Sequence, residues 1–425
     1  MTGREFIDDL KWRGLLAQST DEAALVAALD DGVVTAYIGF DPTAASLHIG
    51  HLVVLLALRR FQLAGHRPIA LVGGATGLVG DPSWRSTERA LNDEEVVAGW
   101  VSSIRGQLEA FLSFDDLPNG AVMANNLDWT GPLTALELIR DIGKHFSVNQ
   151  MLAKDSVSTR LDGGGISYTE FSYQILQAYD FLELYRRENC TLQMGGSDQW
   201  GNITAGLDLI RRVEQGSAHA VTMNLLMKAD GTKFGKTAGG AVWLDPGMTS
   251  PYAFYQYWFN TDDADIVNYL KFFSFADHAT IDDLAVQVRE RPAQRGAQRF
   301  LAREMTTLVH GAKECGRVES AAAALFGQGE LSEVAEETLA GALSQVPRAT
   351  IVRSEELPSL VELLAATGVV DSKSAAKRTI REGGAYVNNV KVTDEAFVPS
   401  RRDLLHDRFL VLRRGKRDIA AIEVS

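Results

Sequence analysis

The sequence predicts an α/β protein whose first domain is a Rossmann-like, doubly wound parallel sheet. Five short apolar runs have the composition of buried strands, and helical segments separate them. A strand–helix–strand unit at this spacing implies parallel pairing, so the carboxyl ends of the strands should meet at one edge, where such sheets bind ligands. The five runs are residues 33–40, 68–73, 121–125, 192–194 and 220–226.

The helices follow from caps and apolar runs. Residues 19–22, Ser-Thr-Asp-Glu, have the pattern of a capping box and precede an Ala/Leu run that stops near Gly32. The aromatic run 252–259 indicates a helix packed in a core. The remaining helices are expected at 51–64, 92–114, 168–187, from Ser197 or Asp198 to Arg212, and throughout 281–326.

Changes in composition along the 425-residue chain predict further domains. An irregular helical stretch at about 127–160 interrupts the sheet pattern and is expected to be an insertion. We expect the Rossmann-like domain at 1–245, a helical subdomain at 246–330, an acidic, Ala-rich connector at 331–357 and a small α+β domain at 358–425.

Composition excludes several classes of protein. Hydrophobic content of 46% and charged content of 23% are ordinary for a globular protein, and no apolar run approaches the length of a membrane span. The only cysteines, Cys190 and Cys315, support neither a disulfide framework nor a zinc site, so we expect a reducing cytoplasm.

The distribution of charge matters more than the net charge of −13, which argues against general nucleic-acid binding. Residues 358–425 hold twelve Lys/Arg and nine Asp/Glu, a net charge of +3, so the rest of the chain carries −16. A basic module on an acidic body suggests a local contact with RNA or DNA. An ordinary solvated surface would also fit a charge of +3.

The stretch 37–51 is the first candidate site. A strand ends there in a turn containing Pro42, and an apolar helical run begins at Leu52. His48, Gly50 and His51 fall where this helix should start. A helix N-terminus offers unpaired N–H groups and a positive dipole end, which makes it an anion site, although histidines that only cap or pack are about equally compatible with the pattern.

A second candidate lies on the helix predicted at 168–187. Tyr173, Gln177 and Asp180 are spaced i, i+4 and i+7 and therefore share one face. A stripe of phenol, amide and carboxylate is either solvated surface or a face that reads a ligand, and periodicity alone does not decide between them.

Three further segments combine turns with charge. The run 193–199 places a glycine turn and Asp198 at a helix start, where a simple N-cap is an alternative. The two lysines of the loop Lys233–Thr237 could bind phosphate groups, or the loop could be an ordinary solvated basic loop. Asp81 is by default a turn residue. A functional role for these segments gains support because the turns would converge on one edge of the sheet.

These segments together resemble one family along nearly the whole chain, the bacterial tyrosyl-tRNA synthetases of class I. Residues 48–51, His-Ile-Gly-His, are similar to the "HIGH" signature of the class, and Lys233–Thr237 resembles its second signature, "KMSKS". Residues 195–202, Gly-Gly-Ser-Asp-Gln-Trp-Gly-Asn, resemble a block of the tyrosine enzymes. Phe234-Gly235 departs from the Met-Ser of the class signature, which leaves open which lysine contributes more.

The resemblance implies a role for each matching residue. Tyr37 and Asp180 would read the phenol hydroxyl of tyrosine, and Tyr173, Gln177 and Asp81 would hold its ammonium group. Asp41, Gln193 and Gln199 match residues that position tyrosine or ribose. The nucleotide-site matches are Gly39, Gly50, Gly196 and Asp198, and the matches to groups that stabilise the transferring phosphates are His48, His51, Lys233, Lys236 and Thr43.

The resemblance further implies tyrosine–tRNA ligation: L-tyrosine and ATP, accompanied by Mg²⁺, would give tyrosyl-adenylate, which tRNA then attacks. It implies neither a protein-held metal nor a tightly bound cofactor, and no membrane or DNA partner. It also implies a homodimer, whose surface we expect within 127–159. The third domain resembles the RNA-binding domain of the S-four type of ribosomal protein, and Lys373, Lys377, Arg378 and Arg381 share a helical face that could contact phosphates.

Three alternatives remain on sequence grounds. They are the tryptophan enzyme of the same fold, another nucleotidyltransferase with a His-x-Gly-His turn, and a catalytically inactive RNA-binding relative. Tyr37 with Asp180 weighs against the first, and the basic loop and RNA domain weigh against the second. The third would be expected to have lost His48, His51 or Lys236, and all three are present.

Overall fold

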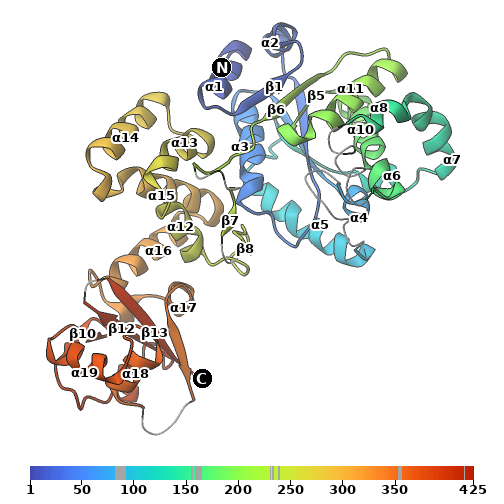
Figure 1. Cartoon of the computed structure of the whole chain (residues 1–425). Coiled ribbons are helices and arrows are strands. Elements are labelled where there is room, and N and C mark those ends of the chain that lie inside the picture. Colours follow the sequence, from blue (N-terminus) through green and yellow to red (C-terminus); the bar gives the residue numbers. More distant parts are fainter. Residues whose placement is uncertain are drawn as a thin grey trace. The chain divides into compact units, whose positions relative to one another are not determined.

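The computed structural model describes residues 1–81, 92–154, 157, 165–229, 231, 234–237, 240–352, 357–415 and 417–425. They form two compact units, which are best described separately (Figure 1). Unit 1 comprises Met1–Leu244 and Asp262–Pro292, and unit 2 comprises Asp245–Thr261 and Ala293–Ser425. No helix in the described part of the chain is long and apolar enough to cross a membrane.

Unit 1 contains a six-stranded sheet in the order β1-β6-β5-β2-β3-β4. All neighbours pair in parallel except β1, which is antiparallel to β6. The strand order reverses between β2 and β5, so these two strands form the switch point of a doubly wound sheet. The strands are β1 (Leu16–Ser19), β2 (Thr35–Phe40), β3 (Arg67–Val72), β4 (Val122–Asn125), β5 (Cys190–Gly196) and β6 (His219–Met223).

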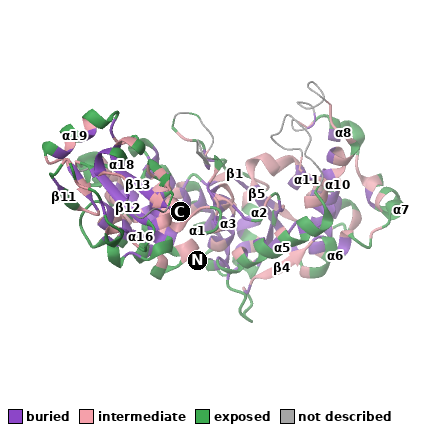
Figure 2. Cartoon of the chain, turned by 90° about the horizontal axis from the view of Figure 1, so that it is seen from below, coloured by how far each residue is buried: buried purple, intermediate pink, exposed green. Residues whose placement is uncertain are grey.

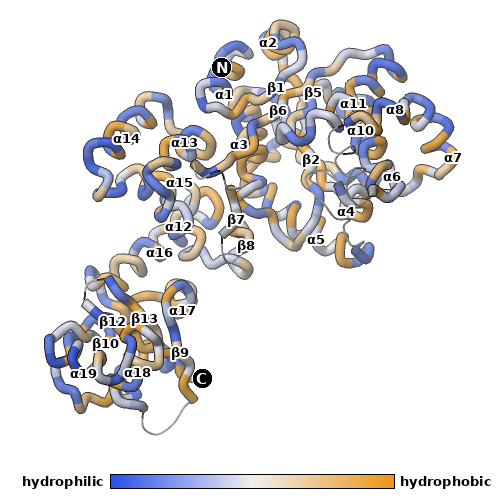
Figure 3. Tube along the Cα trace, viewed as in Figure 1, coloured by the Kyte–Doolittle hydropathy of each residue, from blue (hydrophilic) through white to orange (hydrophobic). Residues whose placement is uncertain are grey.

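Helices cover both faces of this sheet. The face that carries Tyr37 packs against Phe181 and Leu182 of α10 and Leu209 of α11. Helix α3 packs on β2, β3 and β5 and is coloured as one of the most hydrophobic parts of the unit in Figure 3. The helices around the sheet are α1 (Gly3–Trp12), α2 (Glu22–Asp31), α3 (Ile49–Leu63), α4 (Thr76–Val79), α5 (Glu94–Glu109), α10 (Tyr168–Glu188), η3 (Ser197–Gln199) and α11 (Trp200–Val213).

Short elements complete unit 1. The segment expected as an insertion forms α6 (Leu127–Thr130), α7 (Ala135–Glu137), η1 (Leu138–Ile142), η2 (Gly143–His145) and α8 (Val148–Leu152). A small hairpin, β7 (Lys236–Thr237) with β8 (Gly240–Ala241), follows the sheet, and α13 (Asp263–Phe273) and α14 (His278–Glu290) close the unit.

Unit 2 combines helices with a five-stranded sheet in the order β11-β10-β12-β13-β9. Its apolar core includes Leu364, Ile380, Leu412 and Ile422. The elements are α12 (Pro251–Phe259), η4 (Pro292–Gln294, whose first residue belongs to unit 1), α15 (Gly296–His310), α16 (Ala312–Leu325), η5 (Leu331–Glu333), α17 (Glu336–Leu343), β9 (Arg348–Ile351), α18 (Leu360–Ala366), α19 (Lys373–Arg381), β10 (Ala385–Val387), β11 (Val390–Val392), η6 (Arg401–Asp403), β12 (Phe409–Arg414) and β13 (Asp418–Val424).

The predicted Rossmann-like α/β class is confirmed, and all five predicted strands are present. β1, a four-residue strand without apolar alternation, was not predicted; among the described strands it pairs with β6 alone, and that pairing is antiparallel. The stretch 331–357 was expected to be a connector, yet α17 and β9 lie there and β9 pairs in parallel with β13. Neither strand has a local pattern that reveals its partner, because that partner lies far away in the chain.

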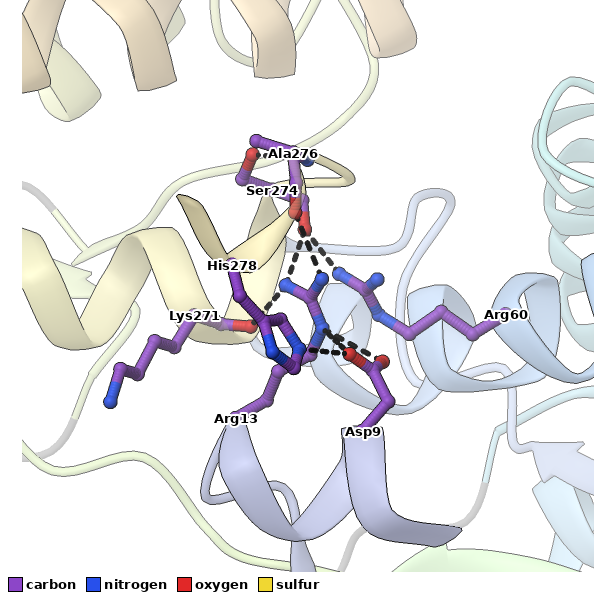
Figure 4. Close-up of polar contacts among 7 residues, drawn as sticks. All are labelled: Asp9, Arg13, Arg60, Lys271, Ser274, Ala276 and His278. Atoms are coloured by element: carbon purple, nitrogen blue, oxygen red, sulfur yellow. Dashed lines mark hydrogen bonds and ion pairs between the residues drawn. The ribbon is translucent and has the colours of Figure 1, made fainter. Parts of the chain in front are cut away.

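The division into units also differs from the expected boundaries. Helices α13 and α14 lie within the stretch expected as a separate helical subdomain, but they belong to unit 1. The physical reason is a pair of buried arginines, Arg13 directly after α1 and Arg60 in α3, that bind the end of α13 (Figure 4). A helical pattern in sequence cannot show such long-range contacts.

Candidate active site

The switch point of the sheet holds a cavity of about 380 Å³. Tyr37 of β2 and Gln193 of β5 are paired in the ladder that joins these strands, and both face the cavity. The cavity thus lies where a doubly wound sheet is expected to bind its ligand. Fifteen of the residues selected from sequence line it: Tyr37, Gly39, Asp41, Thr43, His48, Gly50, His51, Asp81, Tyr173, Gln177, Asp180, Gln193, Gly196, Asp198 and Gln199.

Asp180 supplies a buried carboxylate at this cavity. Trp129 donates its indole N–H to Oδ1 at 2.8 Å, and Asn126 donates from Nδ2 to Oδ2 at 3.0 Å. Burial raises the pKa of Asp180 to about 7, and these two donors act in the opposite direction. The carboxylate is thus held in place but poorly compensated, which favours a further donor from a ligand.

Three buried polar atoms at the cavity have no hydrogen-bond partner among the described residues. They are the hydroxyl oxygen of Tyr37 and the amide oxygens of Gln177 and Gln193. Burying such atoms without partners is unfavourable by roughly 1–3 kcal/mol each. Burial, with Asp180 next, raises the pKa of Tyr37, so its phenol stays protonated and can both donate and accept. The site is therefore built for a polar ligand.

A hydrogen-bonded chain connects Asp180 to a second carboxylate, Asp41. Besides binding Asp180, Asn126 donates from Nδ2 to the hydroxyl of Thr76 at 2.9 Å, and Thr76 donates in turn to Asp41 Oδ1 at 2.6 Å. Tyr173 donates to Asp41 Oδ2 at 2.6 Å. Because each donor has a defined acceptor, this chain fixes the orientation of both carboxylates.

Close approach at this chain requires a glycine. A Cβ atom at Gly73 would lie 2.1 Å from Oδ1 of Asp41 and 2.4 Å from the hydroxyl of Thr76. Any side chain there would displace Asp41 from its donors.

A second polar group centres on Gln199. Its amide nitrogen donates to Asp81 at 2.8 Å and to Asp198 at 3.4 Å, and its oxygen accepts from Asn202 at 3.2 Å. Asp198 is not a helix cap, because residues 197–199 form a 3-10 turn and no side chain caps α11. Burial raises the pKa of Asp198, with a hydrogen bond from Gln199 opposing that shift. With Asp41, these carboxylates make the cavity wall acidic, which suits a cationic group.

The two histidines lie at the start of α3. This helix begins at Ile49, three residues before Leu52, where the predicted apolar run begins. His48 is the N-cap and accepts from the backbone N–H of Gly50 at 3.0 Å, while His51 accepts from that of His48 at 3.1 Å. Both acceptors are Nδ1 atoms, so the ring N–H of each imidazole is on Nε2. Burial lowers the pKa of His51 to about 3, so this ring is a neutral donor at pH 7.

The structure explains why residue 50 is glycine. A Cβ atom there would lie 2.8 Å from the imidazole of His48, so only glycine lets that ring fold back over the helix start. Gly50, which matches the nucleotide site of the family, thus also has a role within the chain itself. The two imidazole rings stack with centroids 4.0 Å apart.

The loop Lys233–Thr237 is described in part. Lys233 lies outside the described residues, and for Lys236 only the backbone, in β7, is described. Gly235 has φ +87° and lies beside the start of α3, since a Cβ on it would be 3.6 Å from the nitrogen of Gly50. The loop backbone thus reaches the helix of the histidines.

The chain leaving this loop is bonded to the segment before α3. Ile49 donates its N–H to Val242 at 2.9 Å, and Leu244 donates to Leu47 at 2.9 Å. These bonds hold two segments that are almost 200 residues apart in sequence next to each other.

Comparison with known proteins gives the family. A sequence profile for tRNA synthetases class I (W and Y) matches residues 30–327, and one for the tyrosine–tRNA ligase SYY-like C-terminal domain matches residues 338–422. The chain belongs to the class I tRNA synthetases. The family expected from the two signatures is therefore confirmed.

Relatives in this synthetase family match nearly the whole chain. The tyrosine–tRNA ligase of Streptomyces coelicolor is 62% identical over 423 residues, which is 99% of each chain. That of Mycobacterium tuberculosis is 57% identical over 418 residues, 98% of each chain. A crystal structure of a C-terminally truncated mitochondrial tyrosyl-tRNA synthetase of Aspergillus nidulans superposes with a TM-score of 0.68 at 29% identity, covering 75% of this chain and 95% of that one.

Sequence reasoning missed the residues that support the site of this synthetase. Asn126, Trp129 and Thr76 hold the carboxylates of Asp180 and Asp41, and Asn202 holds Gln199. Asn126 directly follows a predicted strand, so the rule that used strand ends could have found it. Nothing in the local sequence indicates the contact of Trp129.

Replacing Asp180 with asparagine should change how stability depends on pH. The pKa of Asp180 rises from 3.8 to about 7 on folding, so its contribution to stability is fully present below pH 4 and is lost as pH rises to 7. Relative to Asp180→Asn, the wild type should lose up to about 1.4 kcal/mol of unfolding free energy per pH unit in this window. Urea unfolding at several pH values measures it, and parallel curves for the two proteins would contradict the assignment.

Proposed function

We propose that the chain is a tyrosine–tRNA ligase, which joins L-tyrosine to its tRNA through a tyrosyl-adenylate made from ATP. One observation carries the proposal: a single cavity holds both the buried carboxylate of Asp180 and the phenol of Tyr37, whose hydroxyl has no hydrogen-bond partner among the described residues. A substrate hydroxyl can donate to Asp180 and accept from Tyr37 at the same time. Relatives of the chain over its full length are named tyrosine–tRNA ligases, which supports the same substrate.

The substrate ammonium group fits the acidic wall. Tyr173, Gln177 and Asp81 are proposed to hold it, and the amide oxygen of Gln177 lacks a partner among the described residues. Gln193 is the remaining tyrosine-binding residue, on the strand that pairs with that of Tyr37. The three carboxylates of the acidic wall, Asp41, Asp81 and Asp198, favour a cation there over a neutral group.

ATP is proposed to lie along the strand ends and the start of α3. Gly39 is exposed and nothing would lie within 4 Å of a Cβ on it, so its backbone is open to a flat ligand. Asp41, Asp198 and Gln199 offer acceptors and a donor for ribose. A Cβ at Gly196 would lie 2.4 Å from Oδ1 of Asp198, so glycine keeps that carboxylate in place.

The chemical step requires alignment and neutralisation of charge rather than a base. The carboxylate of tyrosine is ionised at pH 7 and attacks the α-phosphate of ATP directly. We propose that the Nε2–H groups of His48 and His51, with Thr43, Lys233 and Lys236, stabilise the transferring phosphates. Neutral imidazoles at a helix N-terminus donate to phosphate oxygens without having to gain a proton first.

Magnesium is proposed to enter as part of the MgATP substrate. No group of three or more potential ligand side chains in the described residues could hold a metal ion. Mg²⁺ usually binds through substrate phosphates with one or two carboxylates, and the carboxylates of the cavity wall fit that pattern.

Contact with tRNA is proposed for the small domain at 358–425. Lys373, Lys377, Arg378 and Arg381 are all exposed on α19, which is strongly hydrophilic in Figure 3, while Ile380 is buried beneath them. Lys373 is paired with Glu362 and Arg381 with Glu395, so Lys377 and Arg378 are the stronger candidates for phosphates. Both cysteines of the chain are buried and unpaired, which fits the proposed cytoplasmic location.

The alternative of a tryptophan enzyme shares the fold, since the family profile covers both types. The pair formed by Tyr37 and Asp180 favours tyrosine, because an indole offers no hydroxyl. Inactive RNA-binding relatives are disfavoured because His48 and His51 keep a geometry suited to donation.

Amino-acid-dependent exchange of pyrophosphate into ATP tests this function. Tyrosine should support exchange, and tryptophan should not. Tyr37→Phe should raise the KM for tyrosine by about two- to tenfold, as expected for one lost neutral hydrogen bond, and should reduce discrimination against phenylalanine. Exchange with tryptophan alone would overturn the proposal.

A homodimer is proposed through the inserted segment at 127–160. Leu136, Ile139 and Val148 are 78%, 63% and 58% exposed, and Figure 2 shows α7 in the colour of exposed residues. Apolar side chains gathered on one exposed segment favour contact with a second copy of the chain.

Leu136→Asp combined with Ile139→Asp should weaken dimerisation at least tenfold, because each buried leucine-sized side chain contributes roughly 1.5–3 kcal/mol. Sedimentation equilibrium measures the dissociation constant. Leu63→Asp is the matched control, since Leu63 is 67% exposed outside the segment. Equal effects of the control and the double variant would rule out this surface.

A further inference from the structure

Two buried arginines bind the C-terminal end of α13. Arg13, directly after α1, donates from its guanidinium to the carbonyl oxygens of Lys271, Ser274 and Ala276 at 3.2, 3.0 and 2.9 Å. Arg60 of α3 donates to the same carbonyl of Ser274. Figure 4 shows both guanidinium groups pointing at this carbonyl cluster. The carbonyls at a helix end lack partners within the helix, and cations are favourable there.

The same cluster is held from the other side. Asp9 accepts from Nε of Arg13 at 2.9 Å and contacts His278 at 2.9 Å, and the His278 ring stacks on Trp12 with centroids 3.6 Å apart. Arg13 and Arg60 are only 4% and 7% exposed. Buried charges with this many partners fix the position of α13 relative to α1 and α3.

Helix α13 in turn supports the loop of the second signature. Asp265, Tyr269 and Phe273 are spaced four residues apart and form one buried stripe. Asp265 accepts from the backbone N–H of Ala229 at 2.8 Å, just before the loop. The ring of Phe234, inside the loop, lies 5.1 Å from those of both Tyr269 and Phe273.

Helix α3 joins these contacts to the histidines. His48 caps its first turn and Arg60 lies near its end, roughly 18 Å away at 1.5 Å per residue. Gly235 lies against the start of the same helix. The position of the loop relative to His48 therefore depends on contacts at both ends of α3.

We propose that Arg60, with Arg13, is a positioning residue for adenylate formation: it fixes α13, and through Phe234 the loop of the second signature, relative to the helix that carries the histidines. The inference rests on the proposed function. Arg60 is not among the described residues that line the cavity, so its effect should fall on the rate of the chemical step rather than on tyrosine binding. A small displacement of groups that stabilise a transition state has a large effect on rate.

Arg60→Met removes the donor and keeps the apolar stem, and Arg59→Met is the matched control. Arg59 lies next to it on α3, also stacks near Phe275, but donates to Phe111 instead of α13. Single-turnover formation of tyrosyl-adenylate should be about tenfold slower in Arg60→Met at saturating substrates, with the Kd for tyrosine unchanged. Arg59→Met should stay within about twofold of the wild type in rate.

A double-mutant cycle tests the route through the loop. Phe234→Leu alone should also slow the step without changing the Kd for tyrosine, and adding Arg60→Met should slow it less than the two separate effects predict. Three results would overturn the inference. They are equal rates for Arg60→Met and Arg59→Met, additive effects of Arg60→Met and Phe234→Leu on the rate, and a Kd for tyrosine that changes together with the rate.

The outcomes separate this inference from the proposed function. A wild-type protein without tyrosine-dependent exchange would refute the function, whereas an active wild type with an unaffected Arg60→Met variant would refute only the positioning role. If Arg60→Met does not fold, Phe234→Leu decides, because an unchanged rate in that variant overturns the inference.

Discussion

The buried carboxylate of Asp180 imposes the main constraint on this fold. A carboxylate removed from water needs donors, and the described residues supply two, from Asn126 and Trp129. Its pKa of about 7 shows how incomplete that compensation is. Asn126 also orients Thr76, and Thr76 in turn orients Asp41. One hydrogen-bonded chain therefore connects Asp180 to Asp41 of the acidic wall. The phenol hydroxyl of a bound tyrosine would add the missing donor at Asp180, and the ammonium group of the same tyrosine would meet the acidic wall.

Helix α3 is the second organising element. Its first turn presents two neutral imidazole donors, and its last turn reaches the end of α13 through Arg60. The loop of the second signature lies between these two ends, with Gly235 against the first turn and Phe234 on α13. The substitution of Phe234 for methionine in the class signature thus has a structural reason, since an aromatic ring packs against two others. In the proposed function, the strand–turn–helix at 37–51 holds the amino acid at one end, through Tyr37, and the phosphate groups at the other, through His48 and His51.

The sequence allowed prediction of the strands around the site and of the fifteen residues at the cavity, because strand ends, glycine turns and two spaced signatures are local features. It did not indicate Trp129, Thr76 or Arg13, whose roles depend on contacts between residues about 35 to 260 positions apart. β1 and β9 were missed for the same reason, as each is short and defined by its partner strand. Asp198 shows the reverse case: its position suggested a helix cap, and tertiary structure turned it to the cavity.

Proton release on tyrosine binding tests the central role of Asp180 most directly. Calorimetry of L-tyrosine binding at pH 7, in buffers with different ionisation enthalpies, measures it. With a pKa of about 7, Asp180 is half protonated in the free pocket, and it must be ionised to accept the phenol hydroxyl. Binding should therefore release about half a proton per site, and none in Asp180→Asn. Absence of release in the wild type, or equal release in the variant, would contradict this account.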